Sequence, residues 1–135
     1  MDSKTFADDF IAALHELEQA EGGDAPVQNI VALFAPDAKL VNSALLLGGE
    51  PLTGTDGATE FWTQYKKTIG VGKSEFHHIA ASDSTAGLFW KTTVRGGAGQ
   101  YDGATLLAFD DTGKISHFQG YYDTRQLNEA VGVGE

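Results

Sequence analysis

The chain has 135 residues and no cysteine, and its 19 acidic and 9 basic residues give a formal net charge of -10 at pH 7. This length suits a single domain spanning 1–135, and the lack of cysteine excludes disulfides, thiolate nucleophiles and cysteine metal sites. The negative charge disfavours nucleic acid and anionic membranes as partners, and no apolar run approaches the ~20 residues of a membrane span, so we expect a cytoplasmic protein.

Two helices are predicted in the first part of the chain, where apolar residues recur at helical spacing. The first stripe runs from Phe6 to Leu17, and Asp2 or Ser3 can cap its start. The second helix opens at Asp24-Ala25-Pro26, a capping residue followed by an early proline. Its stripe extends to Phe34, and Pro36 is expected to end it.

A short strand and a third helix follow. Ala38–Asn42 is predicted to be the strand, and Leu45–Gly49 a loop or a strand edge. Pro51–Gly54 then turns the chain into a helix capped by Thr55 or Asp56. An aromatic face that continues to Ile69 indicates that this helix is packed against the core.

After Gly72 the apolar period changes to two, which is typical of strands. The intervening Gly, Ser and Asp residues are good hairpin connections, so an antiparallel meander is expected. A tail over 124–130 is predicted to add a helical turn. The four predicted strands are Lys73–Ser82, Thr85–Gly96, Gly99–Asp110 and Lys114–Asp123.

Several segments together carry a resemblance to a known superfamily: Phe10–Leu14, Ile30–Ala35, Pro51 with Thr53-Gly54-Thr55 and Phe61-Trp62, Gly113-Lys114-Ile115, and Tyr121-Tyr122-Asp123. In order and spacing they resemble ketosteroid isomerases and polyketide-cyclase-like (SnoaL-like) members of the nuclear transport factor 2-like superfamily. The resemblance implies an α+β fold in which a cone-shaped, curved antiparallel sheet wraps around N-terminal helices, the nuclear transport factor 2-like or cystatin-like fold. It implies a pocket but no particular activity.

The resemblance also places the catalytic positions of the isomerases on this chain. The base position is Asn42, which cannot accept a proton at neutral pH. The tyrosine position is Phe10, which has no donor, and the protonated-acid position is Thr105, whose hydroxyl can still donate. Steroid isomerisation by the usual mechanism is therefore disfavoured.

An apolar, aromatic chamber with a few polar atoms is expected inside the cone. Strand alternation combined with the family register directs one face of each strand inward, and such chambers suit small hydrophobic ligands. The same aromatic residues could instead fill the core. The candidate ligand-binding residues are Phe10, Leu14, Phe61, Tyr65, Trp90, Thr92, Tyr101, Leu107, Phe118 and Tyr122.

The histidines offer the only side chains that titrate near neutral pH. His77 and His78 are adjacent in one predicted strand, so one is expected to face inward and the other outward. An inward His78, with Asn42 and Thr105 as polarising groups, would supply general acid–base catalysis, although a structural histidine is the plainer interpretation. Neither the histidine spacing nor any acid cluster predicts a metal site, and no cofactor is implied.

Three functions remain open at this point. The chain could be a cofactor-free lyase, cyclase or isomerase acting on a small hydrophobic molecule, a non-catalytic ligand-binding protein, or a protein-interaction domain. On the outer sheet face, Phe89, His117, Gln119 and Tyr121 form a mixed aromatic and polar surface. Because members of the family commonly dimerise through that face, a homodimer is expected.

Overall fold

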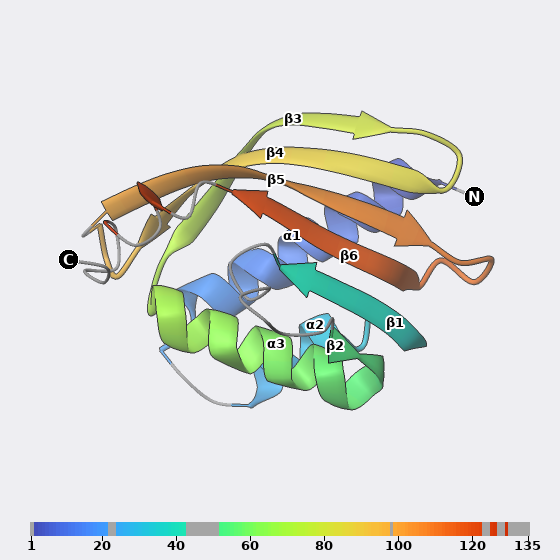
Figure 1. The fold of residues 1–135 in the computed structure, drawn as a ribbon, viewed down its shortest axis with the longest axis horizontal. Coiled ribbons are helices and arrows are strands. Elements are labelled where there is room, and N and C mark those ends of the chain that lie inside the picture. Colours follow the sequence, from blue (N-terminus) through green and yellow to red (C-terminus); the bar gives the residue numbers. More distant parts are fainter. Residues whose placement is uncertain are drawn as a thin grey trace.

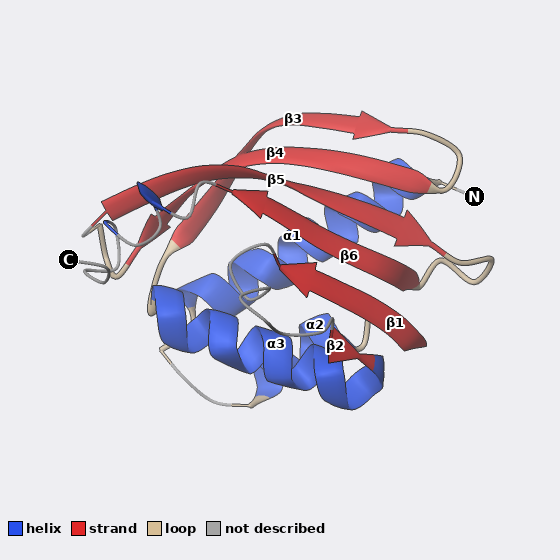
Figure 2. Ribbon diagram, in the orientation of Figure 1, coloured by secondary structure: helices blue, strands red, loops and turns tan. Residues whose placement is uncertain are grey.

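The fold is α+β, as the sequence predicted: three helices are followed by a long antiparallel meander (Figures 1 and 2). The computed structural model describes residues 2–21, 24–42, 52–97, 99–122, 125–126 and 129. Its elements are α1 (Ser3–Gln19), α2 (Ala25–Val31), β1 (Phe34–Asn42), β2 (Leu52–Thr53), α3 (Gly54–Ile69), β3 (Lys73–Ala81), β4 (Thr85–Val94), β5 (Gly99–Phe109) and β6 (Ile115–Tyr122).

One curved sheet has the strand order β2-β1-β6-β5-β4-β3. Strands β3 to β6 pair antiparallel with their chain neighbours, which confirms the predicted meander. The sheet curves over α1, and α3 lies beside β1 (Figure 1). The buried apolar side chains of the helices and of the inner sheet face therefore meet inside the curve.

The second helix and the first strand differ from the prediction. The helix ends at Val31, and Phe34 already belongs to β1, which pairs parallel with β6 through Phe34 and Ile115. Leu33 fixes this change by accepting a hydrogen bond from the Ile115 backbone N–H at 2.9 Å. Pro36 is accommodated because the β1–β6 register shifts between Phe34 and Lys39. At such an irregularity the strand does not need the backbone N–H that proline lacks.

The helix boundaries follow local chemistry. Asp2 caps α1, as predicted, by accepting a hydrogen bond from the Thr5 backbone N–H at 3.3 Å. The third helix begins earlier than predicted: Thr53 is its N-cap, and Leu52–Thr53 forms a short strand against β1 instead of a turn. The predicted loop at 45–49 and most of the predicted tail at 124–130 lie outside the described residues.

Strand β4 shows the expected alternation between the two faces of the sheet. Leu88, Trp90 and Thr92 are buried on the inner face, whereas Phe89 is 41% exposed on the outer face. Trp90 lies opposite Gly103 of β5. A Cβ atom at Gly103 would come within 2.5 Å of the Trp90 ring and of a backbone oxygen, so only glycine leaves room for the indole there.

Candidate functional site

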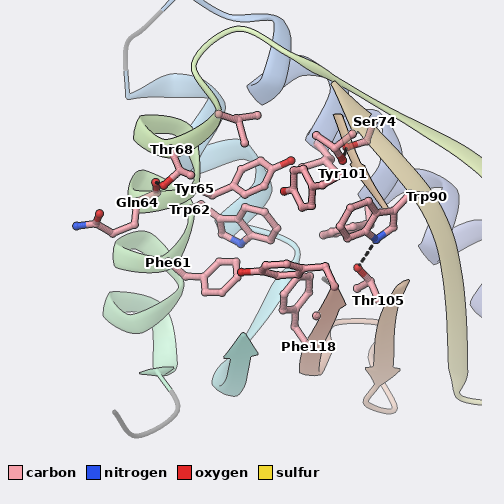
Figure 3. Close-up of a pocket in the computed structure, with 16 residues that line it drawn as sticks. Phe61, Trp62, Gln64, Tyr65, Thr68, Ser74, Trp90, Tyr101, Thr105 and Phe118 are labelled. Atoms are coloured by element: carbon pink, nitrogen blue, oxygen red, sulfur yellow. Dashed lines mark hydrogen bonds between the residues drawn. The ribbon is translucent and has the colours of Figure 1, made fainter. Parts of the chain in front are cut away.

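A cavity of about 130 Å³ lies between α1, α3 and the inner face of β4, β5 and β6 (Figure 3). Its volume approaches the roughly 150 Å³ of an apolar protein cavity that holds one benzene molecule. It therefore has room for a ligand of about one ring. The residues that line it are Phe10, Leu14, Phe61, Trp62, Gln64, Tyr65, Thr68, Ile69, Ser74, Trp90, Thr92, Tyr101, Thr105, Phe118, Gly120 and Tyr122.

One end of the cavity, which we call the aromatic end, consists of Phe10, Phe61, Trp62 and Phe118. The Trp62 ring centroid lies 4.9 Å from that of Phe61 and 5.3 Å from that of Phe118, both edge-on. The ring centroid of Phe10 lies 5.9 Å from that of Trp62. These distances and tilted orientations are those of favourable aromatic pairs. The Trp62 indole N–H is buried without an acceptor among the described residues.

The other end, which we call the polar end, is organised by the carboxylate of Glu18, which is fully buried. Its Oε2 accepts a hydrogen bond from the Tyr65 hydroxyl at 2.6 Å and another from the Ser74 hydroxyl. Its Oε1 accepts one from the Ser74 backbone N–H at 2.9 Å. A buried carboxylate is costly unless it is fully hydrogen-bonded, and these donors satisfy both oxygens.

Two further hydroxyls continue this end toward the strands. The oxygens of Ser74 and Thr92 lie 2.6 Å apart, and the Thr92 hydroxyl partly offsets the rise that burial causes in the pKa of Tyr101. Figure 3 shows the hydroxyl ends of Tyr65 and Tyr101 turned toward the same part of the cavity, beside Ser74. The polar end is therefore a connected network with Glu18 at its centre.

The environment shifts the pKa values of both tyrosines in the same direction. Burial raises the pKa of Tyr65 well above its ordinary value of 10.0, and the negative charge of Glu18 raises it further. Burial also raises the pKa of Tyr101, with Tyr122 and Glu18 adding to the shift. Both phenols consequently stay neutral at physiological pH and act as hydrogen-bonding groups.

Lys66 of α3 lies behind the polar end. Its ammonium donates to the backbone oxygen of Glu18 at 3.1 Å and to that of Gly70 at 2.7 Å. Burial lowers the pKa of Lys66, and the charge of Glu18 opposes that shift. The lysine thus ties the C-terminal ends of α1 and α3 together and provides a positive charge near the carboxylate.

On the side of the cavity toward β4 and β5, Trp90 donates its indole N–H to the Thr105 hydroxyl at 2.9 Å (Figure 3). Thr105 is buried and lines the cavity. The position that the resemblance assigned to a protonated acid therefore holds a hydroxyl that orients Trp90.

Most of the residues predicted to bind a ligand line the cavity, and Leu107 is the exception. Its side chain is fully buried in the core, and its backbone pairs with that of Phe118 in β6. Asn42 ends β1, where its backbone pairs with Gly120. The Asn42 side chain lies outside the described part of the structure.

The prediction that His77 or His78 faces inward is wrong. A β-bulge in β3 shifts the pairing between Phe76 and His78, and both histidines are exposed. Because a bulge adds one unpaired residue, the strict alternation on which the prediction depended does not apply. The His78 ring lies 5.6 Å from that of Phe89, on the outer face of the sheet, so His78 is not a cavity residue.

Sequence reasoning missed the residue on which the polar end depends. Glu18 lies four residues after Leu14 and eight after Phe10, so helical spacing puts it on the buried stripe of α1. An acid on an apolar stripe is the signal that could have revealed it. Its partner Ser74 and the aromatic-end residue Trp62 were also absent from the predicted set.

His15 of α1 contacts the backbone of β3. Its Nε2 lies 2.7 Å from the Ser74 backbone oxygen, which can only accept, so this nitrogen carries the proton. The contact fixes α1 to β3 directly next to the Glu18 network.

Within the described part of the chain, no group of three or more His, Asp or Glu side chains is arranged to hold a metal ion. None of the helices described there has the length and apolar character needed to cross a membrane.

Comparison with known proteins gives both a family and a fold. The family model of the SnoaL-like domain matches residues 6–118, whereas no curated protein matches the sequence. The structure is similar to that of an NTF2-like protein of unknown function from Burkholderia pseudomallei K96243, with a TM-score of 0.75 and 14% identity over 97% of this chain and 98% of that one.

Two other solved structures are also similar. One is the epoxide hydrolase/cyclase-like enzyme SalBIII, which has a role in pyran ring formation in the polyether salinomycin (TM-score 0.71, 12% identity, 92% of each chain). The other is a protein of unknown function with a cystatin-like fold from Methylobium petroleophilum PM1 (TM-score 0.68, 17% identity, 89% of this chain and 74% of that one). At these identities the likeness concerns the fold alone.

Proposed function

Because the chain belongs to the family of SnoaL-like domains, we propose that its cavity binds a small, largely apolar molecule that contains about one ring and one polar group. The observation that carries this proposal is the division of the cavity into an aromatic end and a polar end. A cavity with mostly apolar walls and a few fixed polar atoms is the usual form of a small-molecule site.

Binding is favoured over a reaction by what lies in the cavity. None of its lining residues is a histidine, and His78, the candidate acid–base group, lies on the outer face. SalBIII is described as acting in ring formation, so this fold can serve small-molecule chemistry. Phe10 offers no hydrogen-bond donor to a steroid carbonyl, and we accordingly expect no ketosteroid isomerase activity from the wild-type protein.

A cavity-filling variant tests the proposal. Gly120 lines the cavity, and a Cβ atom there would meet only the Phe118 and Tyr122 rings at 3.9 Å, an ordinary contact distance. Gly120→Leu should therefore fold while its side chain occupies part of the cavity. Toluene, anisole and phenol should quench or shift the tryptophan fluorescence of the wild type in a saturable manner, and Gly120→Leu should lose most of that response.

The control for this experiment is an equally conservative change away from the cavity, such as Ala80→Leu on the exposed part of β3. It should bind the probes as the wild type does. Absence of saturable binding of all three probes to the wild type would contradict the proposed function.

A further inference from the structure

We propose that the cavity selects a ligand whose polar group is a hydrogen-bond donor, that is, a hydroxyl or N–H carried on an apolar ring. This inference rests on the proposed function and specifies the class of ligand. It follows from the direction in which the protons of the polar end point.

The direction is set at Glu18. Its carboxylate can only accept hydrogen bonds, so the Tyr65 hydroxyl, 2.6 Å from Oε2, donates its single proton to it. The Ser74 hydroxyl donates to the same oxygen. Neither of these hydroxyls has a second proton to offer to a ligand.

The direction of the Thr92 proton follows from that of Ser74. Because the proton of Ser74 is used at Glu18, Thr92 must be the donor across the 2.6 Å contact between their oxygens. The single proton of Thr92 is therefore used at Ser74. These protons run toward Glu18, and the Tyr65 oxygen keeps only lone pairs for the cavity.

A ligand acceptor placed at this end would face other acceptors. Beside Tyr65, a carbonyl or ether oxygen would lose its hydration and gain no donor from that hydroxyl, which is unfavourable. A hydroxyl would instead donate to the lone pairs of Tyr65. Three other hydroxyls line the cavity, those of Thr68, Thr105 and Tyr122. Thr68 donates to the Gln64 backbone oxygen at 3.0 Å. Thr105 accepts the indole N–H of Trp90, and Figure 3 shows it on the far side of Trp90 from Ser74.

Three probes of nearly the same shape test the inference by titration of the tryptophan fluorescence at neutral pH. Phenol carries a donor, anisole carries only an acceptor, and toluene carries neither. Burial alone favours anisole, which is the more apolar of the two oxygen compounds. The wild type should nevertheless bind phenol at least about tenfold more tightly than anisole, as one well-made hydrogen bond predicts.

The decisive variant is Glu18→Gln. In this variant the Ser74 backbone N–H still donates to the side-chain oxygen of residue 18. The side-chain NH₂ of the introduced glutamine therefore faces the Tyr65 and Ser74 hydroxyls and donates to them. The Tyr65 proton is then free to point into the cavity, and the preference for phenol should fall to less than about twofold. Glu16→Gln makes the same chemical change on the exposed side of the same helix and should retain the full preference.

The outcomes separate the two proposals. Equal or tighter binding of anisole by the wild type would overturn the inference while leaving the proposed function intact. Failure of all three probes to bind would overturn the proposed function itself. If Glu18→Gln does not fold, Tyr65→Phe decides: it removes one cavity acceptor, so it should weaken phenol binding and spare toluene, and an unchanged phenol preference would contradict the inference.

Discussion

The two ends of the cavity share the helices α1 and α3 but use different strands, β6 at the aromatic end and β3 to β5 at the polar end, and different forces hold them. At the aromatic end, Phe61, Trp62 and Phe118 contact one another edge to face and make no hydrogen bond in the described structure. At the polar end, a fully buried carboxylate receives hydrogen bonds from Tyr65 and Ser74. The aromatic end gives the cavity its shape, and the polar end gives it polarity.

This difference explains why neither end alone defines a ligand. Apolar contacts are non-directional and reward any ring of the right size. Hydrogen bonds reward only the complementary group and penalise the wrong one. A ligand that uses both ends must therefore match the size set by the rings and the proton direction set by Glu18.

The largest expected effect is the loss of an aromatic-end side chain. Trp62→Ala should lower the free energy of unfolding by about 3–5 kcal/mol, because it removes contacts with Phe10, Phe61 and Phe118 and leaves a void. Denaturant unfolding followed by circular dichroism measures this. Val71→Ala, at a side chain that is 44% exposed, should cost under about 1 kcal/mol, and an equal cost for both variants would contradict a packed aromatic end.

The next effect sharpens the comparison at the polar end. Glu18→Leu should cost about 3 kcal/mol even though leucine is apolar, because the Ser74 N–H and two hydroxyls lose their acceptor in a buried site. The same substitution at exposed Glu16 should change stability by less than about 0.5 kcal/mol. A stabilised Glu18→Leu variant would mean that the carboxylate is not held by these donors.

The two ends also differ in how far the sequence predicts them. Helical spacing predicted that Phe10 and Phe61 face inward, because buried apolar residues repeat with the period of their element. For Trp90 and Phe118, strand alternation had to be combined with the register that the family resemblance implied. The same helical periodicity places Glu18 on the buried stripe of α1. No local pattern predicts that Tyr65 and Ser74 hydrogen-bond to Glu18, since they are 47 and 56 residues away from it in the sequence.

The remaining errors arise from local departures from regular periods. The bulge at Phe76 and His78 breaks alternation in β3, so the inward histidine of the prediction does not exist. The parallel pairing of β1 with β6 begins at Phe34 because a hydrogen bond from Ile115 to Leu33 starts the strand early. Such features depend on contacts between distant parts of the chain, and local propensity and periodicity carry no information about those contacts.

A smaller effect should appear at high pH. The pKa values of Tyr65 and Tyr101 lie above the ordinary value of 10.0 in the folded protein, so above about pH 10 the unfolded chain binds fewer protons than the folded one. The free energy of unfolding should then fall with rising pH, by up to about 1.4 kcal/mol per pH unit for each tyrosine. Unfolding curves recorded from about pH 9 upward, roughly where a free phenol begins to ionise, measure this fall in the free energy of unfolding.

The double variant Tyr65→Phe with Tyr101→Phe is the comparison for that experiment. Its stability should fall less steeply over the same pH range, because the two buried phenols are gone. Tyr121 is 49% exposed and serves as the control: Tyr121→Phe should leave the slope unchanged. Equal slopes in all three proteins would contradict the burial of the two cavity phenols.

The smallest effect on stability concerns the outer face, which neither end of the cavity reaches. Phe89 and Tyr121 are 41% and 49% exposed there, and we propose that this face associates with a second copy of the chain. Phe89→Glu should shift the mass measured by light scattering toward the monomer, because a carboxylate is costly in an apolar contact. A wild-type mass equal to that of one chain at micromolar concentration would contradict this proposal.

The most direct test of a ligand cavity uses the two tryptophans of the chain, Trp62 and Trp90, since both line it. Nuclear magnetic resonance of ¹⁵N-labelled protein resolves one indole N–H signal from each, one hydrogen-bonded to Thr105 and one without an acceptor in the described structure. Saturating phenol should move both signals in the wild type and neither in Gly120→Leu. Two unmoved indole signals in the wild type would contradict the account.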